Sequence, residues 1–443
     1  MNSFRLLPLF VAVSAALALP VGAQSLVELY ESARTFDASY QSAKSQYDAT
    51  LARADQAKAA ILPTANLAVG ASRSTQEVSP EGAPSSDRSF GTENATVSAS
   101  QPLYRPGNWA SYRQGLKQVD LAQAQLSVAD QDLIVRVSQA YFDVLASQDS
   151  LTFVQAQKTA VGEQLASAKR NFEVGTSTIT DTREAQARHD LVIAQEIAAE
   201  NDLRVKRIAL DQLVGKSDTQ PQALALPLTL PPLAPDDVNI WVQQSEAEHP
   251  SIKQTQVALD VAQLETQKAQ AGHKPTLDLV ASYSAINNVN GSSSSTGSSR
   301  VNTGAIGLSF NLPLFAGFST QNRIRETLAL EEKARNDLDG AKRSVAQGTR
   351  TAYFGVLSGQ GQVKALEAAE ASSQSALDAN KLGYQVGVRI NIDVLNSQSQ
   401  LFDTKAKLAK ARYDVLVGGL RLRQASGTLK AEDLQSVNGL LAK

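Results

Sequence analysis

The stretch "AYFDVL" (Ala140–Leu145) decides the fold, because it recurs later in the chain as "AYFGVL" (Ala352–Leu357). The two copies lie 212 residues apart. The same spacing relates "LPTANLAV" (62–69) to "KPTLDLVA" (274–281). A match over this distance that needs almost no gaps indicates an internal duplication. We therefore expect one structural unit of roughly 200 residues to occur twice in tandem.

The duplication divides the chain into segments. We expect a first repeat over 24–215, a connecting segment over 216–240, a second repeat over 241–427 and a tail over 428–443. The first 23 residues have another pattern, with Arg5 ahead of an apolar run and small residues before Gln24. This pattern predicts a secretory signal peptide, since the run is shorter than the ~20 residues of a membrane helix.

The composition excludes several classes of protein. Cysteine is absent and the net charge is −2, so disulfides, thiolate metal sites and a basic surface for nucleic acid are not expected. The three histidines, His189, His249 and His273, share no metal-ligand spacing. No nucleophile elbow, phosphate loop or zinc motif occurs. We therefore expect neither an enzyme nor a bound cofactor.

Each repeat reads as helices around a pair of strands. In the first repeat, the expected helices span Leu26–Ala60, Trp109–Phe172 and a stretch ending near Leu213. In the second repeat, they span Trp241–Gly272, Gln321–Tyr384 and a stretch ending near Ala425. In the first long helix, apolar residues recur every seven positions at Val119, Leu126 and Leu133. This spacing favours a coiled coil. A continuous helix of this length would extend roughly 96 Å, more than a globular domain.

The strands are predicted by residues that alternate in polarity. In "AIGLSFNL" (305–312), Ile306, Leu308 and Phe310 alternate with Gly307 and Ser309. Three other segments, near 66–72, 95–102 and 277–284, show the same alternation. Each is about ten residues long, the length of a tilted strand that crosses a bilayer. Polar loops are expected over 75–93 and 287–302. A half-buried sheet of a soluble protein is the alternative for these strands.

Four strands cannot close a membrane barrel, and open strand edges are not tolerated in lipid. The chain must then assemble with copies of itself. Two copies would supply eight strands and three copies twelve, and the strand pattern does not choose between them. A structural or adhesive coiled-coil rod with a small β tip is the alternative for the whole molecule; it explains the heptads but not the strands.

Three further features carry a resemblance to a known family. They are the duplicated "AYF" motif, the paired breaks "VGTSTITD" (174–181) and "VGVRINID" (386–393), and the long stretch "NSQSQLFDTKAKLAKARYDVLVGGLRLRQASGTL" (396–429). With these the chain resembles the TolC family of outer-membrane channel proteins over essentially its whole mature length. The resemblance implies an α+β membrane protein, a homotrimer whose 12-stranded β-barrel continues into an α-helical barrel. Segments near 216–239 and 428–443 would form a belt around the helices.

The resemblance also implies a function and partners. The chain would be a passive exit duct in the outer membrane of a Gram-negative cell, extending into the periplasm. It would serve type I protein secretion, multidrug efflux or both. A periplasmic adaptor and an inner-membrane ABC or RND transporter would open it, and outer-membrane lipid would surround its barrel.

The two breaks are the candidate functional site. Gly175 and Gly387 would form the tip turns of the two long hairpins. By resemblance, Tyr384 and Arg389 of the second repeat would bind Thr180 and Asp181 of the first and hold the tip shut. Without the resemblance, the sequence "DTRE" (181–184) favours Asp181 as a helix N-cap, with Glu184 completing a capping box.

Asp393 has a second expected role. By resemblance, three copies of Asp393 would form a ring of carboxylates at the constriction, and a second ring often lies one turn later. Here that later position is Asn396, so we expect a weaker negative field and weaker block by multivalent cations. The alternative is that Asp393 only caps a helix beginning near Val394.

Overall fold

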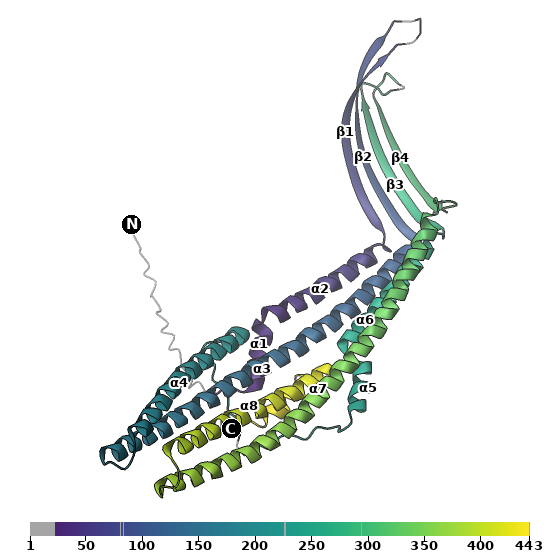
Figure 1. Ribbon diagram of the computed structural model, residues 1–443. Coiled ribbons are helices and arrows are strands. Elements are labelled where there is room, and N and C mark those ends of the chain that lie inside the picture. The colour runs from purple at the N-terminus through teal and green to yellow at the C-terminus, as the bar shows by residue number, and fades with distance from the viewer. Residues whose placement is uncertain (1–22, 80, 83, 226, 294, 443) are drawn as a thin grey trace, which may run out of the picture.

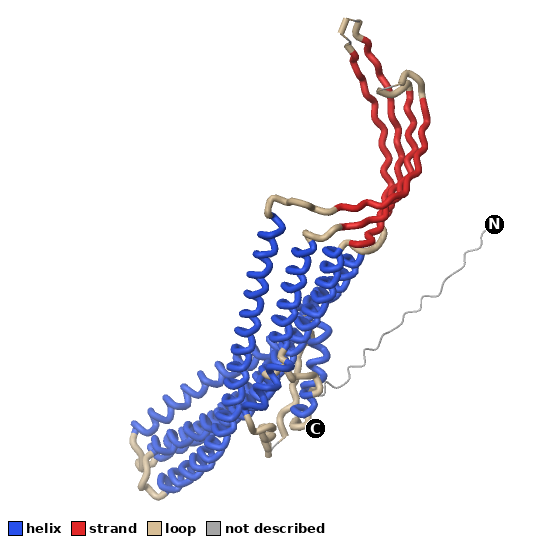
Figure 2. The backbone as a smooth tube through the Cα atoms, turned by 90° about the vertical axis from the view of Figure 1, so that its right-hand side faces the viewer, coloured by secondary structure: helices blue, strands red, loops and turns tan. Residues whose placement is uncertain are grey.

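The computed structural model describes residues 23–442 apart from 80, 83, 226 and 294. The predicted signal peptide therefore lies outside the described residues, except for its last position. The chain is elongated, with a curved sheet at one end and long helices that run away from it (Figure 1). The same division into a strand part and a helical part is clear from the side (Figure 2).

The elements follow one order twice. The first set is α1 (Leu26–Phe36), α2 (Ala38–Ala59), β1 (Thr64–Val78), β2 (Ser86–Tyr104), α3 (Pro106–Glu173) and α4 (Ile179–Val214). The second set is α5 (Val238–Glu248), α6 (Pro250–Ala271), β3 (Thr276–Val289), β4 (Ser299–Asn311), α7 (Ser319–Gln385) and α8 (Asn391–Ala425). A short helix, α9 (Asp433–Asn438), lies in the tail. Equivalent helices match closely: α1 and α5 each have 11 residues, and α2 and α6 each have 22.

The opening helix of each repeat is broken, and the prediction of one continuous helix was wrong in both. Asp37 caps α2 by accepting a hydrogen bond from the Tyr40 amide at 2.8 Å. His249 caps α6 through Nδ1, which accepts from the Ser251 amide at 3.1 Å. A polar cap inside a polar helical stretch does not interrupt the hydrophobic period, so the pattern could not show the break.

The sheet has the order β1-β2-β3-β4, with every neighbouring pair antiparallel. Its register brings Leu67, Val97 and Tyr283 side by side on one face. The opposite face is polar, and there the Thr96 hydroxyl donates to Ser284 Oγ at 3.2 Å. One apolar and one polar face is the pattern of strands that separate lipid from a water-filled lumen.

The strands have 13 to 19 residues, longer than the expected ten. Much of the two segments expected as loops continues the ladder; Arg73 pairs with Gly91 and Asn287 with Arg300. Backbone hydrogen bonds keep these residues in the sheet whatever their side chains, because a ladder needs only paired backbone groups. The polar residues of these two segments therefore belong partly to strands that extend beyond the apolar band, and not only to the loops.

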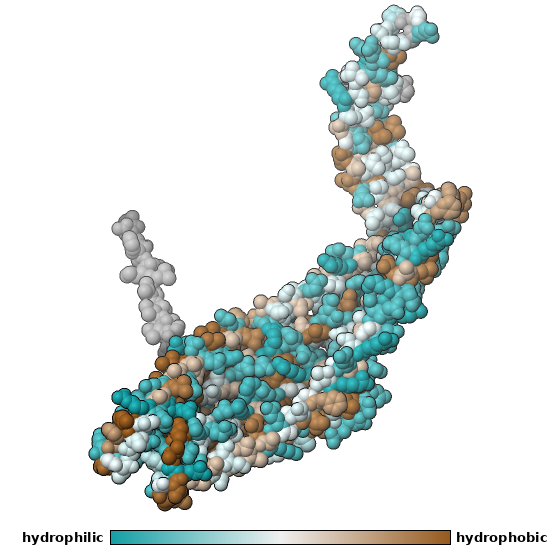
Figure 3. Space-filling model, viewed as in Figure 1, coloured by the Kyte–Doolittle hydropathy of each residue, from teal (hydrophilic) through white to brown (hydrophobic). Residues whose placement is uncertain are grey.

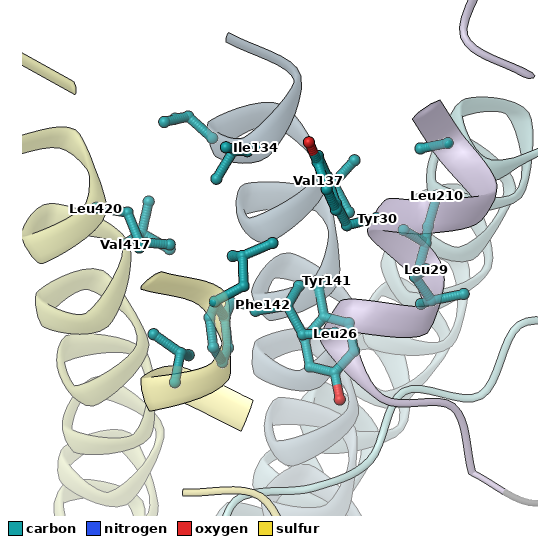
Figure 4. Packing of buried hydrophobic residues seen from close by; sticks show 14 of the residues in the cluster. Leu26, Leu29, Tyr30, Ile134, Val137, Tyr141, Phe142, Leu210, Val417 and Leu420 are labelled. Atoms are coloured by element: carbon teal, nitrogen blue, oxygen red, sulfur yellow. The ribbon is translucent and has the colours of Figure 1, made fainter. Parts of the chain in front are cut away.

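The "AYF" motif of the first repeat lies in the largest apolar core, where α3 meets α1, α4 and α8 (Figure 4). Tyr141 and Phe142 are 0% and 1% exposed, and Phe142 stacks on Tyr413 with ring centroids 5.6 Å apart. The Tyr141 hydroxyl donates to the Gln222 carbonyl at 2.9 Å. This bond attaches the connecting segment to the helices at mid-length.

The connecting segment and the tail lie together in the same region. Leu224 forms an isolated antiparallel bridge with Leu441, and Pro221 forms a parallel bridge with Gln24. Leu441 is buried in the same core as the "AYF" motif. In the described part of the chain, none of the helices combines the length and the apolar character needed to cross a membrane.

Candidate functional site: the tips of the helical hairpins

The turns between α3 and α4 and between α7 and α8 lie at the same end of the molecule, opposite the sheet (Figure 1). Gly175 and Gly387 occupy them with φ of 79° and 80°. Their amides donate back to the Phe172 and Tyr384 carbonyls at 3.0 and 3.1 Å. A side chain at this φ would strain the backbone, so glycine ends both helices in the same way.

Asp181 supports the start of α4 but is not its N-cap. Thr178 is the N-cap, and Asp181 is the third helical residue of a capping box. Asp181 Oδ2 accepts from the Thr178 amide at 3.0 Å and from the Thr178 and Ser177 hydroxyls at 2.9 Å. Glu184 takes no part in the box. Burial opposes ionisation, but these hydrogen bonds outweigh it and hold the pKa of Asp181 below its ordinary value.

The proposed partners of Asp181 have other contacts within one chain. Arg389 Nη1 lies 3.6 Å from Asp393 Oδ2, one helical turn away in sequence. The Tyr384 hydroxyl accepts from Asn171 Nδ2 at 3.2 Å. Thr180 is exposed. Across the described residues, no hydrogen bond or ion pair joins Arg389 or Tyr384 to Thr180 or Asp181.

Asn391 links the two tips, and its role was missed from the sequence. It is 1% exposed, its Nδ2 donates to the Asp181 carbonyl at 3.2 Å, and its Oδ1 accepts from Gln164 of α3. Its equivalent in the first repeat, 212 positions earlier, is Ile179. The signal available in the sequence was an amide side chain at a position where the duplicate has an apolar one.

Asp393 and Asn396 have different surroundings. Because α8 begins at Asn391, Asp393 lies in its first turn and does not cap it. The side chain of Asp393 is 34% exposed beside Arg389. Asn396 Oδ1 accepts from Arg188 Nη2 of α4 at 2.8 Å. Within one chain, therefore, Asp393 lies beside the tip turn and Asn396 lies against the neighbouring hairpin.

The tips hold donors, acceptors and charges, but no group arranged for covalent chemistry. Among the described residues, no three side chains of the metal-ligating types are close enough to hold a metal ion. The arrangement supports reversible contacts between two hairpins, made by hydrogen bonds and exposed charges.

Comparison with known proteins gives a consistent result. The family model described as "Outer membrane efflux protein" matches twice, at residues 29–216 and 241–428. The chain is 34% identical to outer membrane protein TolC of Vibrio cholerae over 435 residues, covering 98% of each chain. It is 31% identical to the alkaline protease secretion protein AprF of Pseudomonas aeruginosa over 422 residues, covering 94% of this chain and 87% of the relative.

The fold is also similar to solved structures. The crystal structure of the Campylobacter jejuni CmeC outer membrane channel superposes with a TM-score of 0.78 at 15% identity. The match covers 94% of this chain and 90% of that one. The expected fold class is thereby confirmed: two tandem repeats, four strands per chain and long helices, as in the trimeric channels of this fold.

Proposed function

The chain belongs to the family of outer membrane efflux proteins, and from that premise we propose how it works as an exit duct for secretion and efflux. It resides in the outer membrane and reaches into the periplasm. One observation carries the proposal: a sheet with one apolar and one polar face continues directly into helical hairpins that end in two adjacent tips. Such a molecule can guide cargo through a membrane and a periplasmic space without chemistry of its own.

Three copies form the duct. In the described chain, β1 and β4 each have one unpaired edge, which lipid would not tolerate. Three chains supply twelve strands, enough to enclose a lumen. The lumen is then lined by the polar face, which includes Thr96, Ser284 and Ser309, and lipid contacts Leu67, Val97 and Leu308.

The tips receive a periplasmic adaptor that couples the duct to an inner-membrane ABC or RND transporter. Apolar side chains gather at this end of the surface (Figure 3). Val174 is 72% exposed, Val388 76% and Ile390 61%. Exposed apolar side chains far from the membrane mark a protein-binding surface. A groove of about 800 Å³ between α3, α4 and α8, lined in part by Gln157 and Gln195, offers a second contact farther along the helices from the tips.

The closed tip is held by a latch between the two hairpins. Arg389 and Tyr384 of the second hairpin bind Thr180 and Asp181 of the first. Because one chain does not make these contacts, they form between neighbouring chains of the trimer. Arg389 supports this role because its side chain is 58% exposed and its only ion-pair partner among the described residues is 3.6 Å away. An exposed pair contributes about 0–1 kcal/mol, so three copies can hold the tip yet yield to an adaptor.

Conductance of the purified trimer in planar bilayers tests the latch. We expect Arg389→Ser and Asp181→Ala each to raise single-channel conductance, because each removes one side of the latch. Lys381→Ser is the control, since it removes an exposed cation from the last turns of α7 outside the latch. Unchanged conductance in both latch variants, with intact trimers, would remove this assignment while leaving the exit duct in place.

A further inference from the structure

A recess in the helical part of the molecule lies away from the tips. Here α8 runs between α3 and α7, and the connecting segment packs against these helices (Figure 1). The recess has a volume of about 360 Å³, within the range of pockets that hold small organic molecules. All four parts of the chain line it, through Phe153 of α3, Glu370 of α7, Leu408 of α8 and Leu224 of the connecting segment.

The walls of the recess are largely apolar. Four of the residues that line it are only half-buried, namely Phe153, Leu224, Leu228 and Ala409. Their apolar surface is therefore still in contact with water. Because removing apolar surface from water is favourable, these walls favour a ligand with an apolar body.

The carboxylate of Asp149 also lines this recess. Its Oδ2 accepts from the Tyr413 hydroxyl at 2.7 Å, and its Oδ1 has no hydrogen-bond partner among the described residues. Burial raises the pKa of Asp149 above the ordinary 3.8, and the bond from Tyr413 offsets this only in part. The fold thus stabilises the charged carboxylate less than water does, so a cation brought to Asp149 would be bound favourably.

The two basic residues of the recess already have acidic partners. Lys405 Nζ lies 4.0 Å from Glu370 Oε1, and Arg412 Nη2 donates to Glu367 Oε1 at 2.9 Å. In the described part of the chain, no basic side chain lies within ion-pair distance of Asp149. The recess therefore holds one carboxylate more than its own cations neutralise.

The duplicated helices do not repeat this pair of residues. The positions 212 residues from Asp149 and Tyr413 are Gly361 of α7 and Asn201 of α4. The helices α3 and α7 nevertheless have nearly the same length, 68 and 67 residues. A carboxylate and a phenol at this level are therefore not needed to build the repeat, and they are available to a ligand.

We propose that this recess binds an amphiphilic organic cation, a molecule with an ammonium group on an aromatic or aliphatic body. The ammonium group donates to Oδ1 of Asp149, and the body packs against Phe153, Leu224 and Ala409. The bound molecule contacts both repeats and the connecting segment at once. The inference goes beyond the proposed function, because the exit duct does not require this site.

Two probes with the same apolar body test the role of the charge. Phenylbutylamine carries an ammonium group at neutral pH, and phenylbutanol has a hydroxyl group in its place. Isothermal titration calorimetry of the trimer in lipid nanodiscs gives the Kd of each probe, with empty nanodiscs as the blank for partition into lipid. We expect the native trimer to bind the amine at least about tenfold more tightly, because a charge-assisted hydrogen bond is stronger than a neutral one.

Three variants locate the site. Asp149→Asn is expected to remove the preference for the amine. Asp143→Asn is the control, since it removes a carboxylate of α3 that lies 3.9 Å from Lys206, outside the recess, and it is expected to keep the preference. Ala409→Leu narrows the recess without changing the carboxylate, and it is expected to weaken the binding of both probes by a similar factor.

Equal affinity of the native trimer for the two probes would overturn the proposal, as would a preference for the amine that persists in Asp149→Asn. If Asp149→Asn does not assemble, the native comparison and Ala409→Leu decide, because unchanged binding of the amine in Ala409→Leu would place its site elsewhere. Each of these results leaves the exit duct standing, since the conductance of the latch variants is measured separately.

Discussion

Asp181 accepts three hydrogen bonds at the start of α4, from the amide and hydroxyl of Thr178 and from the Ser177 hydroxyl. The sequence placed this carboxylate at a helix start, but it named the wrong cap, because both Thr178 and Asp181 are residues that cap helices well. The same residue is one side of the proposed latch. Asp181 uses only Oδ2 in the capping box of α4 and keeps Oδ1 without a partner in the described chain, so the two roles are compatible.

The place of Asp181 in the capping box predicts that the stability of the start of α4 depends on pH. Its folded pKa lies below the ordinary 3.8, so the ionised carboxylate stabilises the fold. That contribution is complete above the unfolded pKa and is lost as pH falls through the lower, folded pKa. We expect protection of the first amides of α4 against hydrogen exchange to fall on acidification below about pH 4. In Asp181→Asn, which cannot titrate, protection should be weaker and independent of pH over this range; the same acid response in that variant would assign it to another group.

The carboxylate of Asp393 predicts that cations block the channel at the tip end of the duct. Replacement by Asn removes three carboxylates from the trimer, because each chain supplies one. We expect Asp393→Asn to weaken block of the channel by trivalent cations, measured as a higher blocking concentration in planar bilayers. Asp378→Asn, which removes an exposed carboxylate from α7, is the control. Persistent block in the Asp393 variant would place the cation site elsewhere.

At the scale of elements, the two long helices were well predicted and the two opening helices were not. The bounds of α3 and α7 differ from those expected by three residues or fewer, since heptad spacing and glycine turns mark their ends. At the break between α1 and α2, both oxygens of the capping Asp37 accept hydrogen bonds at 3.0 Å from a distant residue, Arg136. No local pattern shows a partner 99 positions away.

The packing of the core around the "AYF" motif predicts that truncating a buried aromatic side chain there strongly lowers the stability of the fold. Phe142 is 1% exposed and joins α3 to α8, so Phe142→Ala leaves a cavity between elements of both repeats. We expect it to lower the free energy of unfolding by about 3–5 kcal/mol in urea titrations of the detergent-solubilised protein. Phe172→Ala, at a 43% exposed position near the tip, should cost less than about 1 kcal/mol. Similar losses in both variants would contradict the assignment of Phe142 to the core.

At the scale of the whole molecule, the apolar face of the sheet determines how the chain sits in the membrane. Leu308 is 66% exposed on this face, and Ser309 follows it on the polar face. The strand pattern alone was also compatible with a soluble sheet. Membership of the family decides between these alternatives, and between the exit duct and a coiled-coil rod.

Leu308 and Ser309, which are adjacent in β4, therefore predict opposite effects of an introduced charge on folding into lipid. Leu308→Arg places a charge toward lipid and should cost about 2–4 kcal/mol if the residue lies near the bilayer centre. Ser309→Arg places the same charge in the water-filled lumen and should be tolerated. The measurement is the fraction of protein that folds into lipid vesicles, followed by heat-sensitive mobility on gels. Equal losses in the two variants would contradict the assignment of the two faces.

The sequence by itself determined the duplication, the alternating strands, the long helices and the glycine turns, because each depends on residues a few positions apart or on a repeated order. Only the tertiary structure decided that Asn391 is buried between the tips, that Arg389 lies beside Asp393, and that Phe142 is covered while its equivalent Phe354 is exposed. The physical reason is that burial and hydrogen-bond partners depend on which elements meet in space. Two nearly identical motifs therefore have different surroundings, one inside the chain and one at its flank.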